Sequence, residues 1–86
     1  MFYVYVLQSL KSKRWHTGFT HDLRKRFSEH NQAKTGWTRS RAPFQLIYYE
    51  ACLYKEDAEA RELYLKSGMV KRYLKSRLKR FLSLTG

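Results

Sequence analysis

The sequence predicts a small α+β domain in which a three-stranded, mainly antiparallel sheet is flanked by helices, in the order β-β-α-β-α-α. Three segments rich in β-branched and aromatic residues are expected as strands: 2–7, 14–19 and 44–51. Between and after them, apolar residues recur at helical spacing. A chain of 86 residues has room for one hydrophobic core, so residues 1–86 are expected to form a single domain.

The first two strands are expected to form a hairpin. Because side chains alternate along a strand, Tyr3, Tyr5 and Leu7 share one face, and Phe2, Val4 and Val6 share the other. On the second strand, His16 and Gly18 share a face, opposite Trp15, Thr17 and Phe19. The prediction that follows is that Tyr5 and His16 can meet on adjacent strands.

A helix is expected after the second strand, with Thr20 as its cap and its end near Asn31. Leu23, Arg26, Phe27 and His30 would lie on one face of it. Since Leu23 and Phe27 must face the core, Arg26 and His30 are expected to be drawn toward the body of the protein. A guanidinium there needs an anion. The alternatives are an Arg26 stem that packs while its head reaches water, and a His30 that only complements the helix dipole.

Two more helices are expected toward the C-terminus. The first covers 55–67 and ends at Gly68, a residue suited to a left-handed cap. The second covers 70–82 and has an apolar stripe of Val70, Tyr73, Leu74, Leu78 and Phe81. The basic side chains of this second helix lie off the stripe.

The chain is strongly basic. Eighteen Lys and Arg against seven Asp and Glu give a net charge of +11, which favours nucleic acid as the partner. A charged surface that only keeps the protein soluble is the weaker alternative. No apolar stretch is long enough for a membrane span or a signal peptide, so a cytoplasmic protein without membrane contact is expected.

The combination of Tyr3-Val4-Tyr5, His16-Thr17-Gly18, Arg26 and Glu62 resembles the GIY-YIG nuclease family. The similarity is greatest to its small single-domain bacterial members, which are related to the nuclease domain of excision-repair endonucleases. It implies the fold already expected and the hydrolysis of phosphodiester bonds in DNA, and it associates the chain with DNA repair. Two positions depart from the motif: Tyr3 stands at its first glycine, and His16 at its second tyrosine.

The resemblance implies a role for each catalytic candidate. Tyr5 and His16 would activate water, because histidine titrates near neutrality and can act as a base. Arg26 would contact the scissile phosphate, and His30 would position water or phosphate. Glu62 would bind Mg²⁺ or Mn²⁺, since such ions need only one or two carboxylates beside water and substrate oxygens. Glu59 is a competing ligand, and a surface pair of Glu62 with Lys66 is the structural alternative.

Further residues are expected to contact nucleic acid, through basic charge, aromatic stacking or close approach. They are Tyr3, Gly18, Lys25, Lys34, Trp37, Arg39, Arg41 and Lys66. The substrate is expected to be DNA, cut in a structure-directed or weakly sequence-specific way by a monomer or weak homodimer without an organic cofactor. Tyr5 could instead be a core aromatic residue, and Gly18 an ordinary strand end.

Two other functions remain open at this point. His16 could mark a diverged site, in which case the chain is a nucleic-acid-binding module that has lost catalysis. A domain that binds an acidic protein partner is a third possibility. The first alternative predicts salt-dependent binding without metal-dependent cutting.

Overall fold

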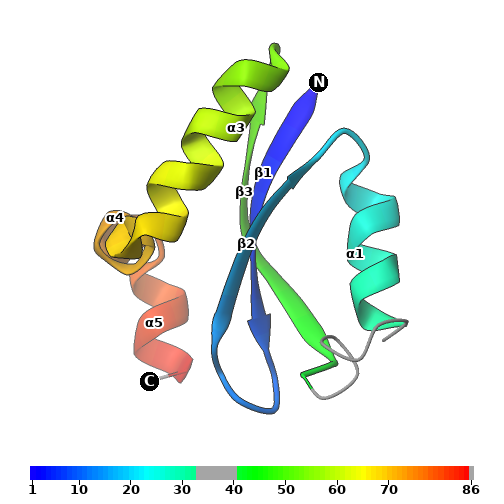
Figure 1. The fold of residues 1–86 in the computed structure, drawn as a ribbon. Coiled ribbons are helices and arrows are strands. Elements are labelled where there is room, and N and C mark those ends of the chain that lie inside the picture. Colours follow the sequence, from blue (N-terminus) through cyan, green and yellow to red (C-terminus); the bar gives the residue numbers. More distant parts are fainter. Residues whose placement is uncertain (33–40, 86) are drawn as a thin grey trace.

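In the computed structural model, which describes residues 1–32 and 41–85, a three-stranded sheet lies between two groups of helices (Figure 1). The elements in chain order are β1 (Phe2–Ser9), β2 (Trp15–Thr20), α1 (Leu23–Asn31), β3 (Phe44–Cys52), α3 (Lys55–Tyr64), the irregular turn η1 (Leu65–Met69), α4 (Val70–Arg77) and α5 (Lys79–Thr85). The predicted fold class and element order are confirmed. Helix α1 covers one face of the sheet, and α3, α4 and α5 lie on the other side (Figure 1).

The strand order is β2-β1-β3, and β1 pairs antiparallel with both neighbours. In this register Tyr5 on β1 lies opposite Gly18 on β2 and Tyr49 on β3. The central strand is therefore shielded on both sides, while β2 is an edge strand. That edge is where the candidate site is found.

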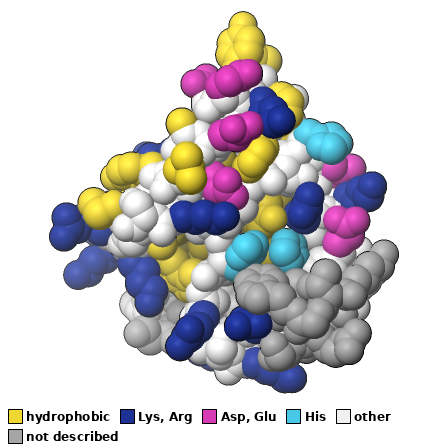
Figure 2. All heavy atoms as spheres, in the orientation of Figure 1, with side chains coloured by type: hydrophobic (Ala, Val, Ile, Leu, Met, Phe, Trp, Pro, Cys, Tyr) yellow, Lys and Arg dark blue, Asp and Glu magenta, His cyan; other side chains and the backbone are white. Residues whose placement is uncertain are grey.

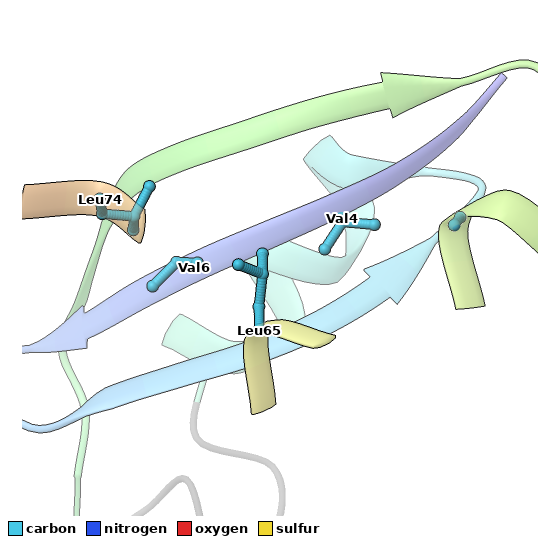
Figure 3. Packing of buried hydrophobic residues seen from close by; sticks show 5 residues of the cluster. Val4, Val6, Leu65 and Leu74 are labelled. Carbon is cyan, nitrogen blue, oxygen red and sulfur yellow. The ribbon is translucent and has the colours of Figure 1, made fainter. Parts of the chain in front are cut away.

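The larger core lies between the sheet and α3–α4. Val4 and Val6 of β1 are fully buried and pack with Ala58, Leu65 and Leu74 from the helices (Figure 3). Figure 3 shows the Leu65 side chain reaching from its helical turn toward β1 between Val4 and Val6. The predicted alternation of β1 is confirmed, because Val4 and Val6 face this core while Tyr5 and Leu7 face the other side.

A second core cluster lies under α1. Tyr5, Leu7 and Phe44 are buried there, and Leu23 and Phe27 of α1 pack against them. Burying these side chains fixes the helix on the sheet by the hydrophobic effect. This packing sets which α1 residues can reach the edge of β2.

Side-chain hydrogen bonds fix both ends of α1. Asp22, not Thr20, is the N-cap: its Oδ1 accepts from the backbone N–H of Lys25 at 3.1 Å, while the Thr20 hydroxyl accepts from the N–H of Asp22. At the other end the Asn31 amide donates to the carbonyl of Phe44 at 3.2 Å and accepts from its N–H at 2.6 Å. Asn31 thereby ties the end of α1 to the start of β3.

The C-terminal helices differ in part from the prediction. Gly68 has φ of +94°, so the expected left-handed residue after the 55–67 helix is confirmed. The single helix expected over 70–82 is wrong, because the chain leaves helical geometry at Leu78 (φ −118°, ψ 39°) and α5 begins after it. An apolar stripe determines which side chains face inward, not whether the axis continues. The turn lets Leu78 pack against the larger core.

Among the described helices, none is long and apolar enough to cross a membrane. The cytoplasmic location stays a prediction.

Candidate active site

Tyr5 forms the floor of the candidate site. Its side chain is 2% exposed, and its ring lies directly against Gly18 of the neighbouring strand. A Cβ atom at position 18 would come within 2.5 Å of the Tyr5 hydroxyl oxygen and 2.7 Å of Cζ. The close approach expected at Gly18 is therefore made by Tyr5 itself, and any larger residue would displace the ring.

Two histidines complete a cluster with Tyr5. The Tyr5 hydroxyl lies 3.2 Å from Nε2 of His30, and either group can donate, depending on the His30 tautomer. The rings of His16 and His30 are 5.2 Å apart, and those of Tyr5 and His16 are 6.3 Å apart. Histidine side chains lie side by side on the face of the molecule drawn in Figure 2. The meeting of Tyr5 with His16 is found, with His30 as a third member.

Burial controls the ionisation of this cluster. It raises the pKa of Tyr5 to about 12, although Arg26 opposes the rise. Burial, followed by His30, Lys66 and Arg26, lowers the pKa of His16 to about 4. The pKa of His30 is also lowered, first by burial and then by Arg26. At neutral pH all three side chains are therefore in their neutral forms.

Arg26 lies at the border of the cluster. The expectation that it is drawn into the body is wrong: its side chain is 49% exposed, and its Nε is 3.8 Å from Glu29 of the same helix. Because α1 packs through Leu23 and Phe27, Arg26 stands at the rim, where its charge acts on Tyr5, His16 and His30. It is positioned beside the cluster without the desolvation that the prediction assumed.

Glu62 brings a carboxylate to the site from α3. Its side chain is 15% exposed and its Oε2 lies 3.2 Å from Nζ of Lys66, so the surface pair considered from the sequence is present. The charge of Glu62 acts on Tyr5, and that of Lys66 acts on His16. Glu59 instead pairs with Lys55 at 3.6 Å and is exposed. Of the two acidic candidates, Glu62 is the one whose charge acts on the cluster.

Arg61, the residue before Glu62, is held by a hydrogen-bond network that was not predicted from the sequence. Nε and Nη2 of Arg61 donate to the Glu50 carboxylate on β3 at 3.0–3.1 Å, and the Tyr48 hydroxyl donates to the same carboxylate at 2.8 Å. The Arg61 guanidinium also lies 4.1 Å from the centre of the Tyr73 ring. Arg61 thereby fixes the rotation of α3, and no local pattern indicates a partner on another element.

A family model described as the GIY-YIG catalytic domain matches residues 1–75. The chain belongs to the GIY-YIG family. This is a nuclease family, so its chemistry concerns nucleic-acid phosphodiesters, and the predicted resemblance is confirmed.

Relatives of this GIY-YIG domain are small bacterial proteins. It is 40% identical to a UPF0213 protein of Clostridium perfringens over 67 residues, which cover 77% of this chain and 71% of the relative. It is 43% identical over 65 residues to a UPF0213 protein of Streptococcus pyogenes, covering 74% and 70% of the two chains. The solution structure of a UPF0213 protein from Bacillus halodurans is 32% identical, with a TM-score of 0.50, and covers all of this chain and 87% of the other.

The remaining predicted nucleic-acid contacts of the GIY-YIG domain are spread over its surface. Arg41 and Lys66 each line a hollow that also includes His16. Tyr3 lines a different groove with Tyr49, whose ring centre is 6.1 Å away, and Lys25 is exposed on α1. The predicted contacts Lys34, Trp37 and Arg39 lie outside the described residues.

The residues present fit a weakly ligated divalent cation. No group of three or more His, Cys, Asp or Glu side chains that could enclose a metal occurs in residues 1–32 and 41–85. Mg²⁺ does not need such a group, since it takes one or two carboxylates with water and substrate oxygens. Glu62 offers one carboxylate, and its Lys66 partner is half-exposed and able to move away. The donor set suits Mg²⁺ or Mn²⁺ better than a fully enclosed metal such as structural zinc.

Proposed function

We propose that this protein is a metal-dependent endonuclease that hydrolyses phosphodiester bonds in DNA in a structure-directed or weakly sequence-specific way. The observation that supports this best is the cluster of Tyr5, His16 and His30, bordered by Arg26 and by Glu62. A carboxylate, a guanidinium and two imidazoles around one buried hydroxyl meet the needs of phosphoryl chemistry. The net charge of +11 supports a polyanionic substrate.

His16 is the better candidate for the general base. The Tyr5 hydroxyl, with a pKa of about 12, holds its proton at neutral pH, whereas the His16 imidazole, with a pKa of about 4, is already neutral. A base this weak gains strength when substrate binds, because the negative charge of a phosphodiester raises the pKa of a neighbouring histidine. Tyr5 then orients the attacking water, and its own hydroxyl is oriented by His30.

Arg26 would neutralise charge that develops on the phosphoryl oxygens. Its present partner, Glu29, is 3.8 Å away and both side chains are more than 40% exposed, so this pair is weak. The guanidinium can turn from Glu29 to a bound phosphate at little cost. The change would replace a solvent-screened contact by a charge-assisted, bidentate one.

Glu62 would hold the divalent cation, which when bound supplies further positive charge to the phosphoryl and leaving oxygens. Lys66 would release the Glu62 carboxylate and turn to a substrate phosphate. The half-exposed Lys66 side chain and the more buried Glu62 carboxylate support this exchange.

The test is cleavage of labelled single-stranded, duplex and branched DNA with Mg²⁺ or Mn²⁺. We expect Glu62→Gln to lower the cleavage rate by about a hundredfold or more, as for loss of a transition-state charge contact. Glu59→Gln, on the same helix but paired with Lys55, is the matched control and should cut at the native rate. Equal cleavage by native protein and Glu62→Gln would refute the metal assignment.

A second candidate is a binding module without catalysis. It is favoured by the two ion pairs, Glu62 with Lys66 and Arg26 with Glu29, which engage both charged candidates with partners three or four residues away along the chain. In that case DNA binding would weaken with rising salt concentration and would be unchanged in Glu62→Gln. No DNA would be cut with either Mg²⁺ or Mn²⁺.

A further inference from the structure

A hollow of about 360 Å³ lies directly beside His16, on the α3 side of the β2 edge. We call it the Trp15 hollow; its lining residues are Trp15, His16, Thr17, Leu65, Lys66 and Val70. Its volume falls within the range of roughly 300–1,000 Å³ typical of small-ligand sites. Because His16 belongs to both the catalytic cluster and this hollow, whatever occupies the hollow lies next to the reacting phosphate.

One part of the wall of the Trp15 hollow is apolar and aromatic, formed by Trp15, Leu65 and Val70. Leu65 is fully buried, and the half-buried Trp15 and Val70 pack at the margin of the larger core. Leu65 and Lys66 come from the turn η1, in which Gly68 adopts φ of +94°, and Val70 follows directly. This kink at Gly68 separates α3 from α4 beside β2.

The rim of the Trp15 hollow is basic. Lys66 lies on one side, and Nζ of Lys71 is 5.7 Å from the centre of the Trp15 ring. A second hollow of about 210 Å³ adjoins it through Trp15 and His16, and Arg14 and Arg41 line that one. Figure 2 shows apolar side chains set among Lys and Arg side chains on this face. Positive charge therefore flanks the Trp15 ring on both sides.

We infer that the Trp15 hollow binds an unstacked nucleobase of the nucleotide next to the scissile phosphate. The base would stack on Trp15, and its flanking phosphates would contact Lys66 and Lys71. Lys71 is exposed on a flexible stem, so it can leave the ring face to the base and turn to a phosphate. Bases in an intact duplex are stacked on each other and cannot enter, so the preferred substrate is single-stranded or contains an unpaired nucleotide. This inference rests on the proposed function.

Trp15 fluorescence provides a test that needs no cleavage. The chain has two tryptophans, so Trp37→Phe leaves Trp15 as the only one. This protein is titrated without divalent metal against a short oligothymidylate, an abasic strand of equal length and charge, and a perfect duplex. We expect the oligothymidylate to quench Trp15 emission and to bind about tenfold more tightly than the abasic strand, as stacking of a base on an aromatic residue predicts. The duplex should bind without quenching.

Two variants separate stacking from charge. Trp15→Leu should weaken oligothymidylate binding about tenfold while leaving the abasic strand nearly unchanged. Lys71→Met, at an exposed position, should weaken the binding of both strands about equally and reduce the salt dependence of binding. Tyr49→Leu removes an exposed aromatic side chain outside the hollow and is the control for Trp15→Leu. Should Trp15→Leu fail to fold, the titrations of Trp37→Phe alone decide whether a base stacks on Trp15.

The outcomes separate this inference from the proposed function. Binding of oligothymidylate can be measured independently by its fluorescence anisotropy. If it binds without quenching the emission of Trp15, the base site is overturned, whatever the cleavage assay shows. An acidic peptide that quenches Trp15 more strongly than DNA would overturn it in favour of a protein partner. Quenching by oligothymidylate together with no metal-dependent cleavage would support the base site and refute the nuclease.

Discussion

The ring of Tyr5 occupies the space that a side chain at Gly18 would need. The two residues lie opposite each other on β1 and β2, and a Cβ at position 18 would come 2.5 Å from the Tyr5 oxygen. The absence of a side chain at position 18 therefore lets the hydroxyl lie within 3.2 Å of His30. In the motif, Gly18 therefore provides the space that the Tyr5 ring occupies.

Gly18→Ala should accordingly displace Tyr5. We expect the free energy of unfolding to fall by about 1–3 kcal/mol, as for overpacking of a well-filled core. Chemical unfolding followed by circular dichroism measures this loss. In the double variant with Tyr5→Leu, the loss should be smaller than the sum of the two single losses, because the shorter side chain vacates the space. Strictly additive losses in the double variant would mean that the two side chains do not compete.

The contact between Tyr5 and His30 should be visible in catalysis. Tyr5→Phe removes the hydroxyl, His30→Gln replaces the ring nitrogen, and each is expected to lower the single-turnover cleavage rate about tenfold to a hundredfold. If the two groups act as one unit, the double variant should be little worse than either single variant. His21→Gln, at an exposed histidine just before α1, is the control. Independent, multiplicative losses would show that the 3.2 Å contact does not couple them.

The sequence predicts well what depends on local pattern. Alternation along β1 places Tyr5 and Val4 on opposite faces, and a glycine marks the end of the 55–67 helix, and both are found. What it does not predict depends on contacts between distant elements. His30 and Tyr5 are 25 residues apart, and the Arg61–Glu50 contact joins a helix to a strand. Such partners are selected by packing, which a periodic pattern does not specify.

The exposure of Arg26 was not predicted for a related reason. Helical periodicity correctly places Leu23 and Phe27 toward the core, but it gives the face of a residue only to within a fraction of a turn. Arg26 lies at the boundary of that face, half-exposed and next to Glu29. Since a guanidinium is charged and its stem is long, the boundary position lets its head remain in water. The place of Arg26 beside the cluster could be predicted from the sequence, but its exposure to solvent could not.

Arg26→Ala should affect catalysis more than binding. A charge contact that strengthens in the transition state is worth about a hundredfold to a thousandfold in rate. By contrast, the loss of one phosphate contact should weaken DNA binding only severalfold in a protein with this much positive charge. Arg24→Ala, an exposed arginine on the same helix, is the matched control, and single-turnover cleavage with parallel binding measurements separates the effects. Native cleavage by Arg26→Ala would refute its assignment.

The low pKa of His16 should appear in the pH dependence of stability. Folding lowers this pKa from 6.5 to about 4, so between these values the unfolded chain binds a proton that the folded protein does not. The free energy of unfolding should therefore rise with pH from about 4 to 6.5 and level off above. His30 shifts in the same direction and adds to the slope. Urea unfolding at a series of pH values measures it.

His16→Asn should make that slope smaller, because the variant has no proton to gain at position 16. In activity, the neutral imidazole required of a base is lost on acidification, so cleavage by the native protein should fall as the pH is lowered. The corresponding fall should be absent from whatever residual cleavage His16→Asn retains. An unchanged stability slope in His16→Asn would show that burial does not lower the pKa of this residue.

The Glu50 carboxylate should support the site from a distance. It accepts four hydrogen-bond contacts at 2.8–3.1 Å, one from the Tyr48 hydroxyl and three from Nε and Nη2 of Arg61. Burial would raise the pKa of Glu50, but the bonds from Arg61 and Tyr48 outweigh it and keep the carboxylate ionised. Glu50→Gln removes that charge and leaves the Arg61 guanidinium without an anionic acceptor. We therefore expect a loss of about 1–3 kcal/mol in the free energy of unfolding.

Because Arg61 precedes Glu62 on α3, loosening the Glu50 contact should also disturb the Glu62 carboxylate, whose charge acts on Tyr5. Glu50→Gln is therefore expected to raise the Mg²⁺ concentration needed for half-maximal cleavage, at a temperature where the variant is fully folded. Lys55→Met breaks a half-exposed pair on the same helix, and such pairs contribute under about 1 kcal/mol, so it should change neither stability nor Mg²⁺ dependence appreciably. A Glu50→Gln protein that loses stability yet keeps the native Mg²⁺ dependence would limit the network to holding α3 on the sheet.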